Sequence, residues 1–240
     1  MILAILLLAF FGTLLSAGTQ GDDPVPEDSR KEDAARFNTT AMTVLAAAYP
    51  YLAEAVADEL GLRDRSGIGI DIGGGPGDLV LELSRLTPGF YWIDADLNPY
   101  FAGFLFQGAL DRGYSGRVSF IQADVHKLPF RSDFADVVVS RGSLQQWQDW
   151  EQAFSEILRV LKPGGKAYIG RGFSANLPLD VAREVRLKQG GGPRYDPDEF
   201  ARRLRGIMNH LGISKYELKR PKSGKDEVNY GVWIVFGKPE

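Results

Sequence analysis

Residues 68–78 read IGIDIGGGPGD, and this stretch decides the fold. A buried apolar strand runs directly into a glycine turn, and the turn opens a helix. Glycine allows positive φ angles and lets a ligand approach the backbone closely. Exposed amides at the start of the helix favour a carboxylate or phosphate. By itself, such a turn indicates only that a ligand binds through backbone amides.

The chain on both sides of this turn alternates between strands and helices. Five short apolar runs have the character of buried strands: 67–72, 90–95, 118–121, 134–139 and 166–170. Three stretches between them are predicted to be helical: 77–86, 99–112 and 149–161. Continuous apolar strands separated by helices indicate a parallel sheet that is covered on both faces.

The C-terminal part follows a different pattern. A helix is predicted over 198–211, with Asp196 or Asp198 as its N-cap. Strands at 213–219 and 230–236 then follow without a helix between them, which favours an antiparallel hairpin at the edge of the sheet. The sequence therefore predicts an α/β fold with a Rossmann-like, doubly wound, seven-stranded sheet. That sheet is mostly parallel with an antiparallel C-terminal hairpin strand, and helices cover both faces.

The N-terminal segment is apolar. Residues 1–15 read MILAILLLAFFGTLL and carry no charged side chain, but the run is shorter than the roughly 20 residues of a spanning helix. Ser16-Ala17-Gly18 would suit signal cleavage. An uncleaved anchor, a cleaved signal and a mis-assigned start all stay open. We expect a signal-like or anchor-like segment at 1–18, a polar linker at 19–33 and one domain at 34–240.

Helical periodicity runs from Ala34 to Leu60, and we expect Pro50 to divide it into two helices.

Composition excludes several classes of chemistry. The chain of 240 residues has no cysteine, which excludes disulfides, thiolate metal sites and cysteine nucleophiles. Its two histidines, His126 and His210, cannot form a three-histidine metal centre, and no metal site is predicted. A net charge of −3 gives no reason to expect a nucleic-acid partner.

Acidic residues follow the next two predicted strands. Asp94 and Asp96 end the run at 90–95, and Asp96 lies about 20 residues past the glycine loop, where a carboxylate can bind ribose hydroxyls. Asp124 ends the following strand and could accept from an adenine amine. An Asx-turn for Asp96 and a helix cap for Asp124 are the structural alternatives. Together the three motifs lie where open α/β sheets bind ligands.

The spacing of the glycines argues against an NAD-linked oxidoreductase. A dinucleotide fingerprint requires a third glycine where this chain has Asp78.

Five segments carry a family resemblance: DIGGGPG (71–77), IDADLNP (93–99), ADVHKLPF (123–130), FADVVVSRGSLQQW (134–147) and EILRVLKPGGKAYI (156–169). With them, residues 68–172 resemble the core of class I S-adenosylmethionine-dependent methyltransferases, especially the subgroup near the ubiquinone and menaquinone biosynthesis enzymes. The resemblance implies S-adenosyl-L-methionine as cofactor, S-adenosyl-L-homocysteine as product and a small-molecule acceptor.

The resemblance also implies roles for individual residues. The glycine loop would hold the methionine moiety, the acid after the second strand the ribose, and the acid after the third strand the adenine. Asp71 matches a position that often orients the amino group of the cofactor, and Val125 one on the adenine face. The cofactor-binding residues expected on this basis are Asp71, Gly73, Gly74, Gly75, Gly77, Asp96, Leu97, Asp124, Val125 and Ser140.

One segment departs from the family pattern. Many relatives read SxxSLHH after the fourth strand, where this chain has SRGSLQQW, so Gln145 and Gln146 replace the paired histidines. That change removes the obvious general base. Methyl transfer from a sulfonium is an in-line displacement, in which orientation and a dry site are the main contributions of the protein. No catalytic residue is therefore assigned.

Candidates on the acceptor side follow the fourth and fifth strands: Arg141, Gln145, Gln146, Trp147, Arg171 and Tyr195. Two arginines at one mouth could bind a carboxylate, phosphate or oxyanion, although each is equally well explained as an exposed or ion-paired charge. Trp147 is favoured as a packing residue.

Two functions are compatible with these features. The first is methyl transfer to a small molecule, and the second is a cofactor-binding module of the same fold that acts as a sensor or assembly partner. Since the cofactor is made in the cytosol, we expect a domain on the cytoplasmic face of a membrane. A cleaved signal would imply export instead, and a mis-assigned start a cytoplasmic protein. The acceptor atom and the oligomeric state stay open.

Overall fold

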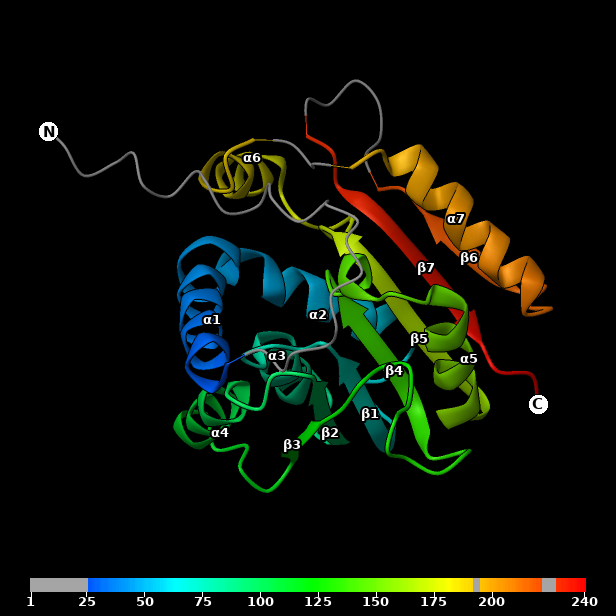
Figure 1. Cartoon of the computed structure of the whole chain (residues 1–240), viewed down its shortest axis with the longest axis horizontal. Helices are drawn as coiled ribbons and strands as arrows, with labels where there is room; N and C mark the ends of the chain where they lie inside the picture. The colour runs from blue at the N-terminus through cyan, green and yellow to red at the C-terminus, as the bar shows by residue number, and fades with distance from the viewer. Residues whose placement is uncertain (1–25, 192–194, 222–227) are drawn as a thin grey trace, which may run out of the picture.

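The computed structural model describes residues 26–191, 195–221 and 228–240. These residues form a seven-stranded sheet of order β3-β2-β1-β4-β5-β7-β6 (Figure 1). The strands are β1 Ser66–Ile72, β2 Gly89–Asp96, β3 Val118–Gln122, β4 Ala135–Arg141, β5 Leu161–Gly172, β6 Tyr216–Lys219 and β7 Gly231–Gly237. β1 to β5 run parallel, and β7 pairs antiparallel with both β5 and β6. The predicted fold class is confirmed.

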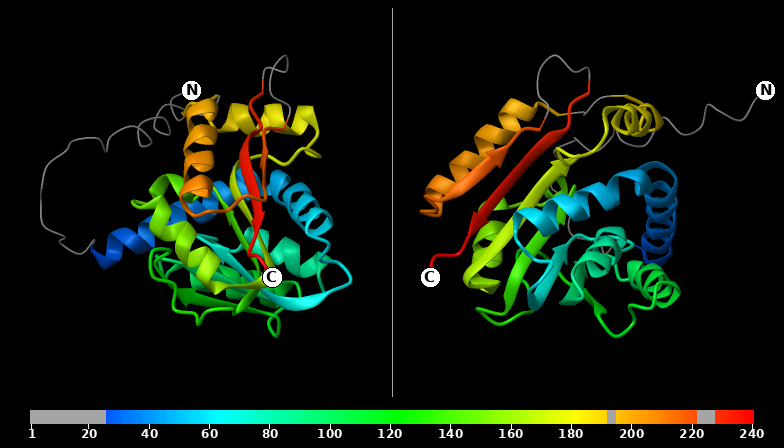
Figure 2. Two further views of the ribbon diagram at one scale, coloured as in Figure 1. Left: turned by 90° about the vertical axis from the view of Figure 1, so that its right-hand side faces the viewer. Right: turned by 180° about the vertical axis from the view of Figure 1, so that it is seen from behind.

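Helices cover both faces of this sheet (Figures 1 and 2). Their bounds are α1 Glu27–Thr40, α2 Tyr49–Glu59, α3 Asp78–Leu86, α4 Phe101–Asp111, α5 Trp150–Val160, α6 Leu179–Lys188 and α7 Pro197–His210. One core contains the buried side chains of α2, α3, α4 and α6, and the other those of α5 and α7. The chain starts at the centre, moves out to β3 and returns to place β4 beside β1, so a ligand-binding switch point lies between these two strands.

The first helix begins earlier than predicted. A linker is expected at 19–33, and α1 begins within that range, at Glu27. Pro26 precedes the helix, and Glu27 and Asp28 in its first turn complement the helix dipole. Residues 19–25 and the apolar segment 1–18 lie outside the described residues. Within the described ranges, no helix combines the length and apolarity needed to cross a bilayer.

The break predicted at Pro50 is confirmed. α1 passes into a π-helical turn at Ala41–Leu45 and a 3-10 turn at Ala46–Ala48, and α2 begins at Tyr49. Pro50 lies in the first turn of α2. A backbone N–H has no intrahelical acceptor at this position, so the absence of one in proline does not weaken the helix.

Several element boundaries also differ from the prediction. β4 continues to Arg141, beyond the run predicted at 134–139, and β5 begins at Leu161, before the run predicted at 166–170. Asp196 is the N-cap of α7, since its side chain accepts from the amides of Asp198 at 2.8 Å and Glu199 at 3.3 Å.

The helix α6 was missed by the sequence reading. Its apolar pattern is sparse, because Ala182 and Val185 are the residues of this helix that become buried. The helix lies beyond the carboxyl ends of β4 and β5 (Figure 1), and it therefore contributes to the edge where a ligand would bind.

Candidate functional site

The glycine loop has no room for side chains. Gly73, Gly75 and Gly77 adopt φ angles of 66°, 62° and 88°. A Cβ atom on Gly73 would lie 2.5 Å from Ser143 Cβ, and one on Gly77 would lie 2.4 Å from Leu105 Cδ1. Both conformation and packing therefore require glycine, and the loop presents its backbone to a ligand.

Asp96 holds this loop from the end of β2. Its Oδ2 accepts from the Gly75 amide at 3.0 Å, and its Oδ1 accepts from the Asn98 amide at 2.9 Å. Burial raises the pKa of Asp96, and the amides of Asn98 and Gly75 oppose that shift. The Asx-turn considered from the sequence is thus present. Each carboxylate oxygen keeps a further lone pair that a hydroxyl can use.

Two more carboxylates are buried next to the loop. Asp71 is 1% exposed and Asp94 is 0% exposed. Burial raises the pKa of both groups well above the usual range; the charge of Asp96 raises the pKa of Asp71 further, and that of Asp71 acts likewise on Asp94. Arg141 opposes the shift at Asp71.

Several buried carboxylate oxygens beside the loop have no hydrogen-bond partner among the described residues. Within the described residues, Asp71 Oδ1, Asp78 Oδ2 and both carboxyl oxygens of Asp94 are buried without a hydrogen bond. The Gly74 amide lowers the pKa of Asp94 without reaching full hydrogen-bond geometry. A buried acceptor left unpaired costs about 1–3 kcal/mol. The cluster therefore fits a ligand that brings a cationic donor, and an amino acid ammonium group is one.

Ser140 braces the loop from β4. Its hydroxyl donates to the Ile72 carbonyl at 2.8 Å and lies 2.7 Å from Ser143 Oγ, which is 3.1 Å from the same carbonyl. The side chain is 1% exposed. Because its hydroxyl is engaged within the protein, Ser140 acts by fixing the end of β1.

The residues expected near adenine lie in the loop after β3 and, in the case of Leu97, directly after β2. Asp124 Oδ1 accepts from the His126 amide at 2.9 Å and lies 2.6 Å from His126 Nδ1. The Asp124 side chain is 53% exposed, Leu97 is 64% exposed and Val125 is 7% exposed. His126 Nε2 also accepts from the Asp149 amide at 3.2 Å, which connects this loop to the start of α5. His126 thus has a structural role.

The acceptor-side candidates divide into two groups. Gln145 and Gln146 are exposed, and Gln145 Nε2 donates to the Gly142 carbonyl of its own loop. Trp147 is 7% exposed and packs edge-on against Phe154 with ring centroids 5.9 Å apart. This contact explains Trp147 as a packing residue.

The arginines form the second group, at the carboxyl edge of β4 and β5. Arg141 Cζ lies 5.0 Å from the centroid of the Tyr49 ring, and its Nη1 donates to Tyr49 Oη at 3.4 Å. Burial raises the pKa of Tyr49 to about 12, and the charge of Arg141 opposes that shift. Arg171 Cζ lies 4.2 Å from the Tyr195 ring centroid.

Arg186 belongs to the same edge and was missed by the sequence reading. It comes from α6, and its Cζ lies 4.3 Å from the centroid of the Phe173 ring. Because α6 itself was not predicted, no pattern placed this residue near the site.

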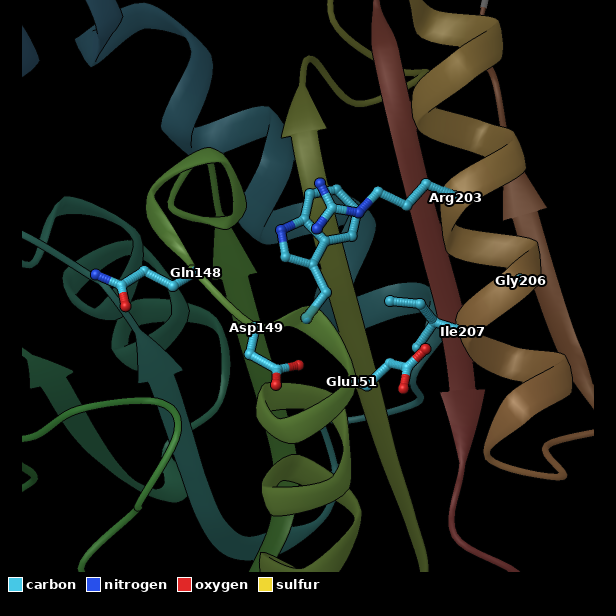
Figure 3. A pocket seen from close by; sticks show the side chains of 7 residues that line it. Gln148, Asp149, Glu151, Arg203, Gly206 and Ile207 are labelled. Carbon is cyan, nitrogen blue, oxygen red and sulfur yellow. The ribbon is translucent and has the colours of Figure 1, made fainter. Parts of the chain in front are cut away.

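A shallow hollow lies elsewhere, between the start of α5 and α7 (Figure 3). Arg203 covers the Trp150 ring there, with Cζ 3.8 Å from the ring centroid. The hollow is on the α5–α7 side of the sheet and contains none of the predicted site residues: its lining is Gln148, Asp149, Trp150, Glu151, Arg203, Gly206 and Ile207. It is therefore separate from the glycine-loop site.

Comparison with known proteins agrees with this geometry. The family model of the methyltransferase domain matches residues 70–169. The crystal structure of a Methanococcus maripaludis protein assigned as an S-adenosyl-L-methionine-dependent methyltransferase is 31% identical, with a TM-score of 0.72, and the match covers 92% of this chain and 98% of that one. The chain belongs to the S-adenosylmethionine-dependent methyltransferases. Its cofactor is S-adenosylmethionine.

Other relatives are similar over smaller parts. The ubiquinone/menaquinone biosynthesis C-methyltransferase UbiE of Stutzerimonas stutzeri is 40% identical over 101 residues, which is 42% of this chain and 40% of the relative. This methyltransferase thus spans about 40% of the length of that relative. Phosphoethanolamine N-methyltransferase 2 of Haemonchus contortus, solved with S-adenosyl-L-methionine, has a TM-score of 0.60 at 17% identity and covers 88% of this chain and 60% of its own. That likeness supports the fold alone.

Proposed function

We propose that this methyltransferase methylates a small-molecule acceptor that enters at the carboxyl edge of β4 and β5. The observation that carries the proposal is the cluster of buried, unpartnered carboxylates beside the glycine loop. It fits the methionine end of the cofactor and leaves the edge near Arg141 and Arg171 for the acceptor.

The cofactor residues follow from this placement. Asp71 and Asp94 would hold the amino group, the glycine loop would face the methionine moiety, and Asp96 would accept from the ribose hydroxyls. Asp124, with Leu97 and Val125 beside it, would face the adenine. When bound, the cofactor supplies a methyl group on a sulfonium, which an electron pair of the acceptor displaces with the C–S bond pair remaining on sulfur.

The side chains at the acceptor edge would orient the acceptor and would not abstract a proton from it. The phenol of Tyr49, with a pKa raised to about 12, stays protonated at neutral pH. Arg141 and Arg171 are cations and cannot act as bases there. The acceptor would therefore arrive as a competent nucleophile, or lose its proton to water before it binds. The protein would then exclude water and align the two reactants.

The match to the UbiE relatives does not identify the acceptor of this chain. The family match ends at residue 169, so Arg171, α6 and Tyr195 lie beyond it. The shared part is the half that binds the methyl donor. We therefore rest the acceptor on the residues of this chain.

The proposal is tested by cofactor binding and methyl transfer measured together. Calorimetry with S-adenosylhomocysteine should give saturable binding, and tritium from labelled S-adenosylmethionine should appear in at least one member of a panel of thiols, quinols, amines and acids. Cofactor binding without transfer to any member would favour the alternative of a non-catalytic sensor or assembly module.

We further propose that the apolar segment 1–15 holds the domain on the cytoplasmic face of a membrane. Its lack of charged side chains supports this, together with the cytosolic supply of cofactor. Cell fractionation of the full chain and of a variant without residues 1–18 should show membrane recovery for the full chain alone. Mass spectrometry of the mature N-terminus would contradict an anchor if the segment were absent.

A further inference from the structure

Three arginines lie at the acceptor edge, and none of them has an anionic partner among the described residues. Arg141 ends β4, Arg171 lies near the end of the neighbouring β5, and Arg186 comes from α6 across that edge. Arg141 pairs with Gly170, so Arg171 lies one position beyond that pair on the neighbouring strand, and the two side chains leave opposite faces of the sheet at its carboxyl edge. Within the described residues, no ion pair involves any of the three.

The positive charges act on one another. The pKa of Arg186 is lowered to about 10, chiefly by burial and also by the charges of Arg141 and Arg171, while Tyr195 opposes the shift. Burial also lowers the pKa of Arg171, again with Arg141 adding to the shift. Arg186 packs on Phe173, two residues beyond Arg171, so all three guanidinium groups lie at one partly buried edge, where like charges repel more strongly than in water.

The contacts that hold these groups leave donors free. Arg186 donates to the Asn229 carbonyl at 2.7 Å and to Gln189 Oε1 at 2.9 Å, but its buried Nε has no partner in the described part of the chain. Arg171 stacks on Tyr195, whose buried hydroxyl is likewise unpaired among the described residues. Stacking on a ring orients a guanidinium without neutralising its charge.

We propose that Arg141, Arg171 and Arg186 bind an anionic group, a carboxylate or a phosphate, on the methyl acceptor. The planar guanidinium fork matches the oxygens of both groups, and an anion would remove the mutual repulsion. The hydroxyl of Tyr195 supplies a further donor. This inference rests on the proposed function, because it takes the edge of β4 and β5 as the acceptor site.

Binding of simple anions tests the subsite directly. The probes are inorganic phosphate and benzoate, titrated into the protein loaded with S-adenosylhomocysteine at ionic strength held constant with chloride. We expect saturable binding of at least one probe, with phosphate and benzoate distinguishing the two anion classes. R171M and R186M should each weaken binding about tenfold or more. R183M is the matched control, because Arg183 is exposed on the same helix, and it should bind as the wild type does.

Folding and charge are controlled separately. Since Arg186 also contacts the Asn229 carbonyl, thermal unfolding and the Kd for S-adenosylhomocysteine are measured for every variant, and R186K should retain more anion binding than R186M. Neither probe binding saturably, or binding that survives both R171M and R186M, would overturn the anion subsite.

Paired acceptors separate this inference from the proposed function. Each acid in the tritium-transfer panel is compared with its uncharged amide, and kcat/KM should be about tenfold or more higher for the acid. Transfer that ignores the charge would reject the subsite and leave methyl transfer standing. Arginine-dependent anion binding without methyl transfer to any acceptor would reject the proposed function and keep the anion subsite.

Discussion

The Gly75 amide nitrogen lies 3.0 Å from Asp96 Oδ2, so the end of β2 directly holds the glycine loop that follows β1. One carboxylate therefore fixes the loop and faces the position expected for a ribose. The Asn98 amide occupies its other oxygen at 2.9 Å, which locks the orientation of the carboxylate. We therefore expect the shape of the loop and the affinity for the cofactor to depend on each other through Asp96.

Replacing Asp96 with alanine should weaken cofactor binding. Hydrogen bonds to a charged group contribute about 1.5–3 kcal/mol, so the Kd for S-adenosylhomocysteine should rise about 10- to 150-fold. Asp96→Asn keeps one acceptor and should lie between alanine and the wild type. Calorimetry gives the Kd, and Asp64→Ala, at an exposed position, serves as the control. A wild-type Kd for Asp96→Ala would remove Asp96 from the ribose site.

Alanine at Gly73 should destabilise the fold more than alanine at Gly113. Both glycines have positive φ angles, 66° and 73°. A Cβ on Gly113 would meet nothing within 4 Å, whereas one on Gly73 would lie 2.5 Å from Ser143 Cβ. Gly113→Ala should therefore cost about 1–2 kcal/mol for the left-handed backbone alone. Gly73→Ala adds overpacking and should cost about 2–5 kcal/mol in denaturant unfolding.

The excess cost at Gly73 should depend on Ser143. In the double variant Gly73→Ala/Ser143→Gly the clashing Cβ is gone, so part of the excess should disappear relative to the sum of the single variants. Strict additivity of the two changes would show that crowding by Ser143 is not the cause.

Much of the fold was predictable because it depends on local and periodic signals. The apolar runs of β1 to β5 are short continuous stretches of sequence, and the structure has a strand at each of them. Asp196 was one of two N-cap candidates for α7, and it is the residue that caps this helix. The start of α1 at Glu27 and the whole of α6 were not predictable in this way. Both are polar segments whose helices are completed by tertiary contacts, such as that of Asn98 Nδ2 with the Arg30 carbonyl at 2.7 Å.

The site was predictable where the chain itself brings residues together. The glycine loop and Asp96 meet because β1 and β2 are adjacent parallel strands that end at the same edge of the sheet. Arg186 was missed because its approach to Arg171 depends on the path of residues 173–188, for which the sequence offers no periodic signal. Ser140 is expected at the cofactor, and its hydroxyl also bonds to the Ile72 carbonyl, a contact between distant residues that the sequence pattern does not predict.

Cofactor binding should release protons. Burial raises the pKa of Asp71 and Asp94, so the free protein holds protons there that an arriving cation would displace. Calorimetric titrations with S-adenosylmethionine at about pH 6, in buffers of different ionisation enthalpy, should report net proton release. Proton uptake, or heats independent of the buffer, would contradict a cationic ligand at these carboxylates.

The same shifts set a pH dependence for the free protein. A carboxyl whose pKa is raised by folding binds more protons in the native state than in the unfolded state. Between its ordinary pKa and its raised one, the free energy of unfolding therefore falls as pH rises. Asp94→Asn removes this ionisation and should stabilise the free protein at neutral pH, whereas the exposed control Asp64→Asn should not. Thermal unfolding against pH measures both.

Truncation of Trp147 should lower the stability of the fold, because the indole is a packing residue and is not expected to contact the acceptor. The indole is 7% exposed and packs edge-on against Phe154, so Trp147→Ala should cost about 3–5 kcal/mol in denaturant unfolding. Trp147→Phe retains an aromatic ring at this contact and should keep both the fold and the kcat/KM for any acceptor found. The exposed neighbour Gln146→Ala should leave stability unchanged. If Trp147→Phe instead raised KM for the acceptor tenfold with unfolding free energy intact, the indole would have to contact the acceptor, because packing alone predicts no such separation.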